Sequence, residues 1–60
     1  MLILDRKKGE SIIMNVNGKI IKVMVTAHMG GNIKLGIKAD DDVIIHREEI
    51  YRKAYPDAEF

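Results

Sequence analysis

The sequence contains no cysteine, no tryptophan and a single proline, and its aromatic residues are two tyrosines and one phenylalanine. The absence of cysteine excludes disulfide bonds, thiolate zinc sites and cysteine nucleophiles. No apolar run approaches the ~20 residues that a membrane-spanning helix requires, so we expect no membrane partner. The apolar start, Met1 to Leu4, is followed at once by Asp5, whereas a secretory signal has a basic segment and a longer apolar core. We therefore expect a cytoplasmic protein.

The chain is short, at 60 residues, but 47% of these residues are hydrophobic and 32% are charged. This content predicts a folded chain rather than a disordered one, and the length predicts a single domain spanning residues 1–60. A core of this size offsets the conformational entropy of folding by a narrow margin, with no disulfide bond to add stability. Because association buries further apolar surface, the small size favours a homodimer.

Charge is distributed unevenly along the chain, although the net charge is only +1. Residues 1–38 contain seven lysines and arginines against two acids, whereas residues 39–60 contain three basic residues against seven acids. This asymmetry is compatible with a basic surface that binds nucleic acid. The alternative is that lysines at alternate positions simply solvate one face of a strand.

The hydrophobic pattern predicts strands over most of the chain. Apolar and polar residues alternate over residues 20–28 and 33–38, which is the period of a strand with one buried face. Asn17-Gly18 is a strong hairpin signal, and Gly30-Gly31-Asn32 indicates a second turn. Together these signals predict five short strands, at about residues 1–6, 10–14, 20–28, 33–38 and 43–46.

The last part of the chain has a helical pattern instead. Residues 47–55 show no alternation, and Pro56 ends the predicted helix before a short tail at 56–60. The favourable i,i+4 pairs of this helix are Glu48→Arg52 and Glu49→Lys53. The expected fold is therefore mainly β, with five short antiparallel strands and a C-terminal helix, and its small sheet has edges that need partners.

No arrangement of residues predicts catalysis or metal binding. Ser11, His28 and His46 lie in no nucleophile motif such as Gly-x-Ser-x-Gly, so we expect no catalytic residues and no enzyme. The acidic run 40–42 lacks the spaced oxygen ligands and terminal glutamate of an EF-hand loop, and is interpreted as a solvated turn. The sequence also lacks a glycine-rich phosphate loop. We therefore expect no metal and no cofactor.

The positions of the aromatic residues restrict how the chain can bind nucleic acid. Tyr51, Tyr55 and Phe60 all lie in the last ten residues, outside the predicted strands. The sheet therefore cannot stack bases on aromatic side chains, as RRM and OB-type sheets do. An RNA contact would use strand backbone groups, basic side chains and aliphatic residues. DNA is not an expected partner, because the predicted helix is amphipathic with leading acids, unlike a recognition helix.

Four segments stand in unbroken order over residues 1–51: Met1-Leu2-Ile3-Leu4-x-Arg6, Gly9-Glu10, Ile37-x-Ala39 and His46-Arg47-Glu48-Glu49-Ile50-Tyr51. As an ordered set they resemble the carbon storage regulator family, CsrA and its RsmA relatives. The resemblance implies an intertwined homodimer, in which the first and last strands of one chain complete the sheet of the other.

The resemblance also implies a function in post-transcriptional regulation. Such proteins bind GGA-containing sites, often in hairpin loops of mRNA leaders, and typically repress translation by blocking ribosome access. Small RNAs with many GGA sites sequester them. In some bacteria a flagellar assembly protein antagonises them, so a protein antagonist of this type is a further expected partner.

The same resemblance implies where RNA would bind. In such proteins the site combines the first strand of one protomer with the fifth strand of the other, so a dimer presents two sites. Carried over to the matching positions, the expected RNA-binding residues are Leu4, Arg6, Lys7, Lys38, Ala39, Ile45, His46 and Arg47. Main-chain groups would read guanine edges, while Arg6 and Arg47 would pair with phosphates or bases. For His46, a hydrogen-bonded role at the strand–helix junction is an equal alternative.

The sequence also departs from the family pattern. Asp5 replaces the usual threonine, Lys7 replaces an arginine and Asp40 replaces a proline, so acidic charge is added near the expected site. The loop between the second and third strands is longer, adding Asn15 to Lys19. These changes predict a divergent paralogue. The alternative function is a protein-interaction module with weakened RNA affinity, acting through a protein antagonist or through mixed dimers with a related regulator.

Overall fold

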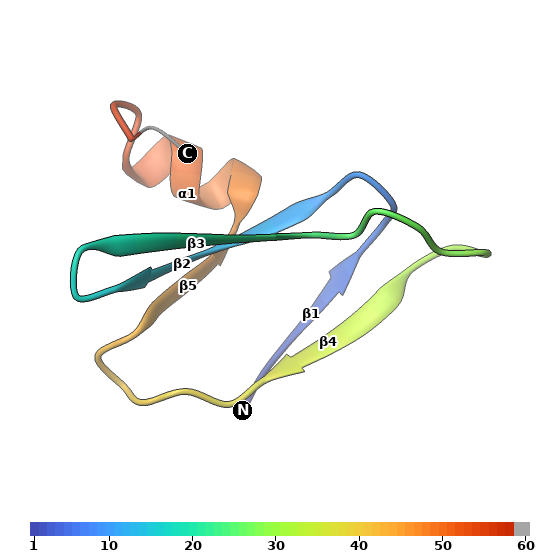
Figure 1. Cartoon of the computed structure of the whole chain (residues 1–60), viewed down its shortest axis with the longest axis horizontal. Coiled ribbons are helices and arrows are strands. Elements are labelled where there is room, and N and C mark those ends of the chain that lie inside the picture. Colours follow the sequence, from blue (N-terminus) through green and yellow to red (C-terminus); the bar gives the residue numbers. More distant parts are fainter. Residues whose placement is uncertain (59–60) are drawn as a thin grey trace.

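The computed structural model describes residues 1–58, so Glu59 and Phe60 of the predicted tail lie outside the described residues. Within this range the chain forms five strands and one helix, in the predicted order. Their bounds are β1 Leu2–Arg6, β2 Ser11–Val16, β3 Lys19–Met24, β4 Ile33–Ile37, β5 Ile44–Arg47 and α1 Glu48–Ala54. The prediction of a mainly β fold with antiparallel strands and a C-terminal helix is confirmed (Figure 1). No helix in this range is long and apolar enough to span a membrane.

The strands form two antiparallel sheets rather than one. β1 pairs with β4, and β2 lies between β3 and β5. In Figure 1 the β1–β4 pair lies beside the three-stranded sheet and is joined to it by the connecting segments. Because both sheets are open, β1, β3, β4 and β5 each keep one edge without a strand partner within residues 1–58.

The β2–β3 hairpin is tighter than the sequence predicted. Asn17 and Gly18 form its two-residue turn, with φ angles of 52° and 83°. Asn15 Oδ1 accepts a hydrogen bond from the Gly18 N–H at 3.0 Å, and Val16 pairs with Lys19 across the turn. The structure therefore places Asn15, Val16 and Lys19, which were assigned to this loop, in the paired strands, and the turn itself has two residues.

β3 ends at Met24, although the alternation predicted a longer strand. Val25 is still bonded to the β2 side of the hairpin: its N–H donates to the Glu10 carbonyl oxygen at 3.0 Å, and its carbonyl oxygen accepts from the Gly9 N–H at 2.7 Å. Beyond this point the paired segment turns away at Gly9, whose φ of 87° lies in the left-handed region. Residues 26–32 therefore have no strand to pair with and form a loop, despite their alternating pattern.

The core lies between β2 and α1. Among the described residues, the buried hydrophobic side chains are Ile12 and Ile13 of β2 and Tyr51 of α1. The Tyr51 ring lies 4.7 Å from the Tyr55 ring, and its hydroxyl accepts a hydrogen bond from Asn15 Nδ2 at 3.3 Å. Because α1 follows β5 directly, this packing also fixes the end of β5 at the first turn of the helix (Figure 1).

Large apolar side chains remain exposed on the single chain, both on strands of the two sheets and outside them. They are Met1, Leu2, Ile3, Ile21, Val23, Met24, Met29, Ile44 and Tyr55. The alternation of residues 20–28 predicted burial for Ile21 and Val23, and this burial is not achieved within one chain. A second copy would be able to cover such residues, and the homodimer itself stays a prediction.

Candidate nucleic-acid interface

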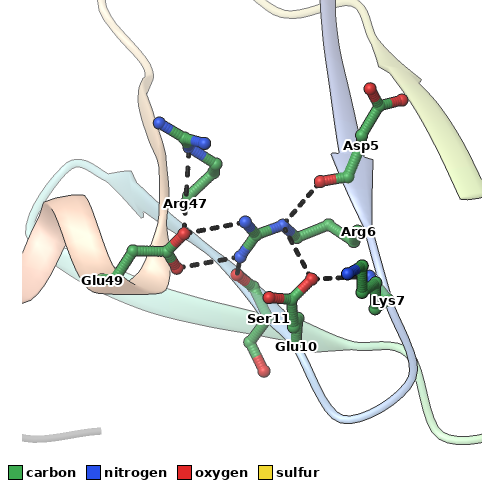
Figure 2. A network of polar contacts seen from close by, with 7 residues as sticks. All are labelled: Asp5, Arg6, Lys7, Glu10, Ser11, Arg47 and Glu49. Atoms are coloured by element: carbon green, nitrogen blue, oxygen red, sulfur yellow. Dashed lines mark hydrogen bonds and ion pairs between the residues drawn. The ribbon is translucent and has the colours of Figure 1, made fainter. Parts of the chain in front are cut away.

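Arg6, the last residue of β1, is buried among polar groups, with its side chain 4% exposed. Nη1 and Nη2 donate to the two carboxylate oxygens of Glu49 at 2.9 and 2.8 Å, which makes a bidentate pair. Nη1 also donates to the Ser11 carbonyl oxygen at 3.2 Å, and Nε donates to the Asp5 carbonyl oxygen at 2.8 Å (Figure 2). The guanidinium therefore ties the end of β1 to the start of β2 and to the first turn of α1.

Glu49 lies in the first turn of α1 with its side chain 52% exposed. The hydrogen bonds from Arg6 lower the pKa of Glu49 from 4.5 to about 2, with further contributions from a backbone hydrogen bond at Glu49 and from the charges of Arg6 and Arg47. The hydrogen bonds with Glu49 also raise the pKa of Arg6. The pair is therefore fully ionised near neutral pH.

Arg47 ends β5 and occupies the position before the first helical residue of α1. Its side chain is 47% exposed, and its Nε lies 4.0 Å from Glu49 Oε2, beyond hydrogen-bond range. Glu49 therefore lies between two guanidinium groups of the same chain (Figure 2). The Arg6 guanidinium is held rigidly, whereas the Arg47 guanidinium reaches the surface, where an anion can approach it.

Lys7 follows Arg6 in the turn between β1 and β2, and its side chain is exposed. Its backbone N–H donates to Glu10 Oε1 at 2.7 Å, and its carbonyl oxygen accepts from the Glu10 N–H at 2.9 Å. The same Glu10 oxygen lies 3.9 Å from Arg6 Nε. The turn thus holds Lys7 close to the Arg6–Glu49 pair.

The other predicted site residues lie on β1 and β5 or in the loop after β4. Leu4, Ile45 and His46 are half-buried, whereas Lys38 and Ala39 are exposed. The His46 ring lies 6.5 Å from the buried Tyr51 ring at the junction of β5 and α1. His46 therefore faces the core on one side.

An open cleft of about 250 Å³ lies at the end of β1 away from the arginines. Its lining residues are Met1, Leu2, Ile37, Ala39, Asp40, Asp41, Val43 and Ile45. Because a strand rises ~3.3 Å per residue, Leu2 lies roughly 13 Å from Arg6 along β1. The structure thus separates three of the predicted residues, the basic Arg6, Lys7 and Arg47, from two others, Ala39 and Ile45, which line the cleft.

The acidic run 40–42 is an exposed turn, closed by a hydrogen bond from the Val43 N–H to the Asp40 carbonyl oxygen at 3.0 Å. Two of its carboxylates, those of Asp40 and Asp41, belong to residues that line the cleft. In the part of the chain that the structure describes, no three histidine, aspartate or glutamate side chains are grouped so as to hold a metal ion.

Glu49 is the residue of this region that the sequence interpretation did not assign to the site. It was expected to pair with Lys53, but it binds Arg6, which lies 43 positions away. The neighbouring pair of Glu48 with Arg52 is present at 3.2 Å, and Glu48 also approaches Lys22 Nζ at 3.6 Å. The sequence gives only a general indication of this pair: an arginine that ends an apolar strand requires a counter-charge when it is buried.

Comparisons with known proteins agree with the ordered segments of the sequence. The family model described as CsrA: Global regulator protein family matches residues 1–55. The chain is also similar to a protein of Halothermothrix orenii named Translational regulator CsrA, with 55% identity over 53 residues. That alignment covers 88% of this chain and 62% of the relative, so the chain spans less than two thirds of the length of the curated relative that it matches. No solved structure matches the chain.

Proposed function

The chain belongs to the CsrA global regulator protein family, and we propose that it is a homodimeric post-transcriptional regulator that binds RNA. The family is one of regulators, not of enzymes. The proposed targets are GGA-containing hairpin loops of mRNA leaders in the cytoplasm, where the bound protein would block ribosome access, and small RNAs with repeated GGA sites would compete for it. The observation that carries the proposal is the half-exposed Arg47 guanidinium at the junction of β5 and α1, within the matched segment.

The chemistry of the proposed surface suits an unstacked, guanine-containing loop. Arg47 offers a planar donor group that can bind a phosphate, or guanine O6 and N7, with two parallel hydrogen bonds. Main-chain groups of the site residues would meet the base edges. The aliphatic and further polar contacts would come from Leu4, Lys7, Lys38, Ala39, Ile45 and His46.

A homodimer would complete this surface. Within residues 1–58 of one copy, β1 and β5 each have an unpaired edge. Pairing the β1 edge of one protomer with the β5 edge of its partner would join a two-stranded and a three-stranded sheet into one sheet. Each site would then need both chains, and each dimer would have two sites. An RNA with two spaced GGA motifs would gain affinity through effective concentration.

Titration of a GGA hairpin RNA, with a GGA-to-CCA hairpin as the specificity control, tests this function. We expect the wild-type protein to prefer the GGA hairpin and to lose affinity as the salt concentration rises, because phosphate contacts release counterions. Arg47→Ala should weaken binding by about 1–3 kcal/mol, since a charge-assisted contact is lost. Fluorescence anisotropy measures each affinity, and circular dichroism checks that the variant keeps its fold.

Lys53→Ala is the matched control, because it removes one positive charge from an exposed position in the last turn of α1. This variant should bind the GGA hairpin as the wild-type protein does. Equal affinity of the wild-type protein for the GGA and CCA hairpins would contradict the proposal. Equal affinity of Arg47→Ala and the wild-type protein would remove Arg47 from the site.

The acidic residues near the site favour a second candidate function, a protein-interaction module with weakened RNA affinity. Asp5 is exposed on β1, beside Arg6, and Asp40 and Asp41 line the cleft. Their carboxylates would repel phosphates and suit a protein partner, either an antagonist or a related regulator in a mixed dimer. Asp5→Thr distinguishes the candidates: the second is favoured if the wild-type protein binds no RNA and this substitution creates binding.

A further inference from the structure

Arg6 has little capacity left for a ligand. Each of its three guanidinium nitrogens donates a hydrogen bond within the chain, and its side chain is 4% exposed. To bind Arg6 through two parallel hydrogen bonds, an RNA phosphate would have to displace Glu49, which holds the guanidinium through both carboxylate oxygens at 2.8 and 2.9 Å. Displacing such a bidentate pair would leave a carboxylate facing the phosphate.

Glu49 is instead the group that an approaching RNA would meet. Its side chain is 52% exposed, and its Oε2 lies 4.0 Å from Nε of Arg47, the proposed phosphate contact. An unneutralised carboxylate at this position would cancel much of the positive charge that Arg47 presents and would repel a phosphate. Because Arg6 pairs with both oxygens, Arg6 and Glu49 together are close to neutral, and Arg47 keeps its positive field.

We propose that Arg6 promotes RNA binding indirectly, by neutralising Glu49, and that the phosphate binds Arg47 rather than Arg6. This inference rests on the proposed function, and it replaces the direct Arg6 contact that the family resemblance implies. Arg6 is then a positioning residue: it anchors the Glu49 carboxylate on β1 and prevents it from opposing the RNA. Glu49 itself makes no favourable contact with RNA in this arrangement.

The decisive variant removes both charges together, as Arg6→Met with Glu49→Gln. Replacing a buried ion pair by uncharged side chains is often neutral for stability, so this double variant should fold. Its RNA affinity for the GGA hairpin should lie within about threefold of the wild-type affinity, because Arg47 is left without an opposing carboxylate. Arg6→Met alone should bind at least about tenfold more weakly, since the bare Glu49 carboxylate then faces the RNA.

The salt dependence separates this indirect role from a direct contact. The slope of log affinity against log salt should be the same for the wild-type protein and the double variant, whereas Arg47→Ala should reduce it by about one phosphate contact. If the double variant instead binds about tenfold more weakly than the wild-type protein, with a slope reduced in the same way, Arg6 contacts phosphate directly and the inference is overturned. Failure of the wild-type protein to bind the GGA hairpin would overturn the proposed function, and this inference with it.

Discussion

At the scale of single residues, the central feature is a buried arginine with a complete set of partners. A buried charge without a partner costs several kcal/mol, because it loses its hydration and gains nothing in return. Arg6 avoids this cost through both oxygens of Glu49 and through two backbone carbonyl oxygens. The pair also links β1 to α1, so its strength contributes to the tertiary structure and depends on Glu49 remaining ionised.

This dependence predicts a specific loss of stability in acid. The pKa of Glu49 is lowered from 4.5 to about 2 in the folded chain, so the stabilisation is present above pH 4.5 and is lost as the pH falls towards 2. Glu49→Gln should lower the free energy of unfolding at pH 7 by about 1–2 kcal/mol, a value reduced because solvent screens the half-exposed carboxylate. Urea unfolding at fixed protein concentration, at pH 7, 4 and 3, measures this effect.

In the same series, the difference in free energy of unfolding between the wild-type protein and Glu49→Gln should become smaller as the pH falls from 7 to 3. Asp41→Asn, which removes an exposed acid from the turn before β5, is the control and should follow the wild-type curve. A Glu49→Gln protein that matches the wild-type stability at pH 7 would contradict a stabilising role of the Arg6–Glu49 pair.

Residue-level contacts of this kind were the part of the site that sequence reasoning could not supply. Both acids of the first helical turn had a local explanation, as i,i+4 partners of the last turn, and for Glu48 that explanation is correct. Glu49 turns to Arg6 because β1 passes the start of α1 in space, which no local pattern indicates. Arg47, by contrast, was predicted to lie at the strand–helix junction. In the structure it precedes the first residue of α1, and its guanidinium is at the surface.

At the scale of the elements, the β2–β3 hairpin depends on the backbone conformation of its turn. Gly18 has a φ of 83°, a region that costs a residue with a side chain about 1–2 kcal/mol. Gly18→Ala should therefore lower the free energy of unfolding by about this amount, although an added Cβ would meet no atom within 4 Å. Chemical denaturation at fixed protein concentration measures the change.

Gly31→Ala provides a matched control for the turn. An added Cβ at Gly31 would also meet no atom within 4 Å, but its φ lies outside the left-handed region. We expect a change of no more than about 0.5 kcal/mol there. Equal effects at Gly18 and Gly31 would mean that the turn conformation contributes nothing to the stability of the hairpin.

The elements themselves were largely predictable, and the exceptions have a common cause. All five strands and α1 were predicted: period-two alternation indicated β3 and β4, Asn17-Gly18 indicated the hairpin, and the loss of alternation before Pro56 indicated α1. Alternation failed in residues 26–28, because a strand needs a paired neighbour and the chain opposite turns away at Gly9. The division into two sheets could not be predicted from the sequence either, since it depends on which strands pair and not on the pattern within each strand.

At the scale of the whole molecule, a single chain leaves much of its apolar surface uncovered. Ile3 is 62% exposed on β1 and Val23 is 40% exposed on β3, while the buried hydrophobic core of residues 1–58 consists of Ile12, Ile13 and Tyr51. So small a core stabilises a monomer weakly, and open sheet edges allow a second copy to pair. Exposed apolar side chains and open sheet edges therefore both favour dimerisation.

We predict a dimer in solution, with a mass twice that of the chain at micromolar concentration. Ile3→Lys should weaken the dimer at least about tenfold, because it introduces a charge on the strand whose free edge is proposed to pair with the partner. Met29→Lys is the matched control: this residue is 97% exposed in the loop between β3 and β4, so the same substitution should leave the mass unchanged. Light scattering coupled to size-exclusion chromatography measures both.

The same variants test whether an RNA-binding site needs residues from one protomer or from both. If each site combines β1 of one protomer with β5 of its partner, Ile3→Lys should lose RNA affinity in parallel with dimerisation, and raising the protein concentration should restore both together. Met29→Lys should retain both. A folded wild-type monomer that binds the GGA hairpin with full affinity would show that one chain carries the complete site, and the proposed pairing of β1 with the partner's β5 would then be wrong.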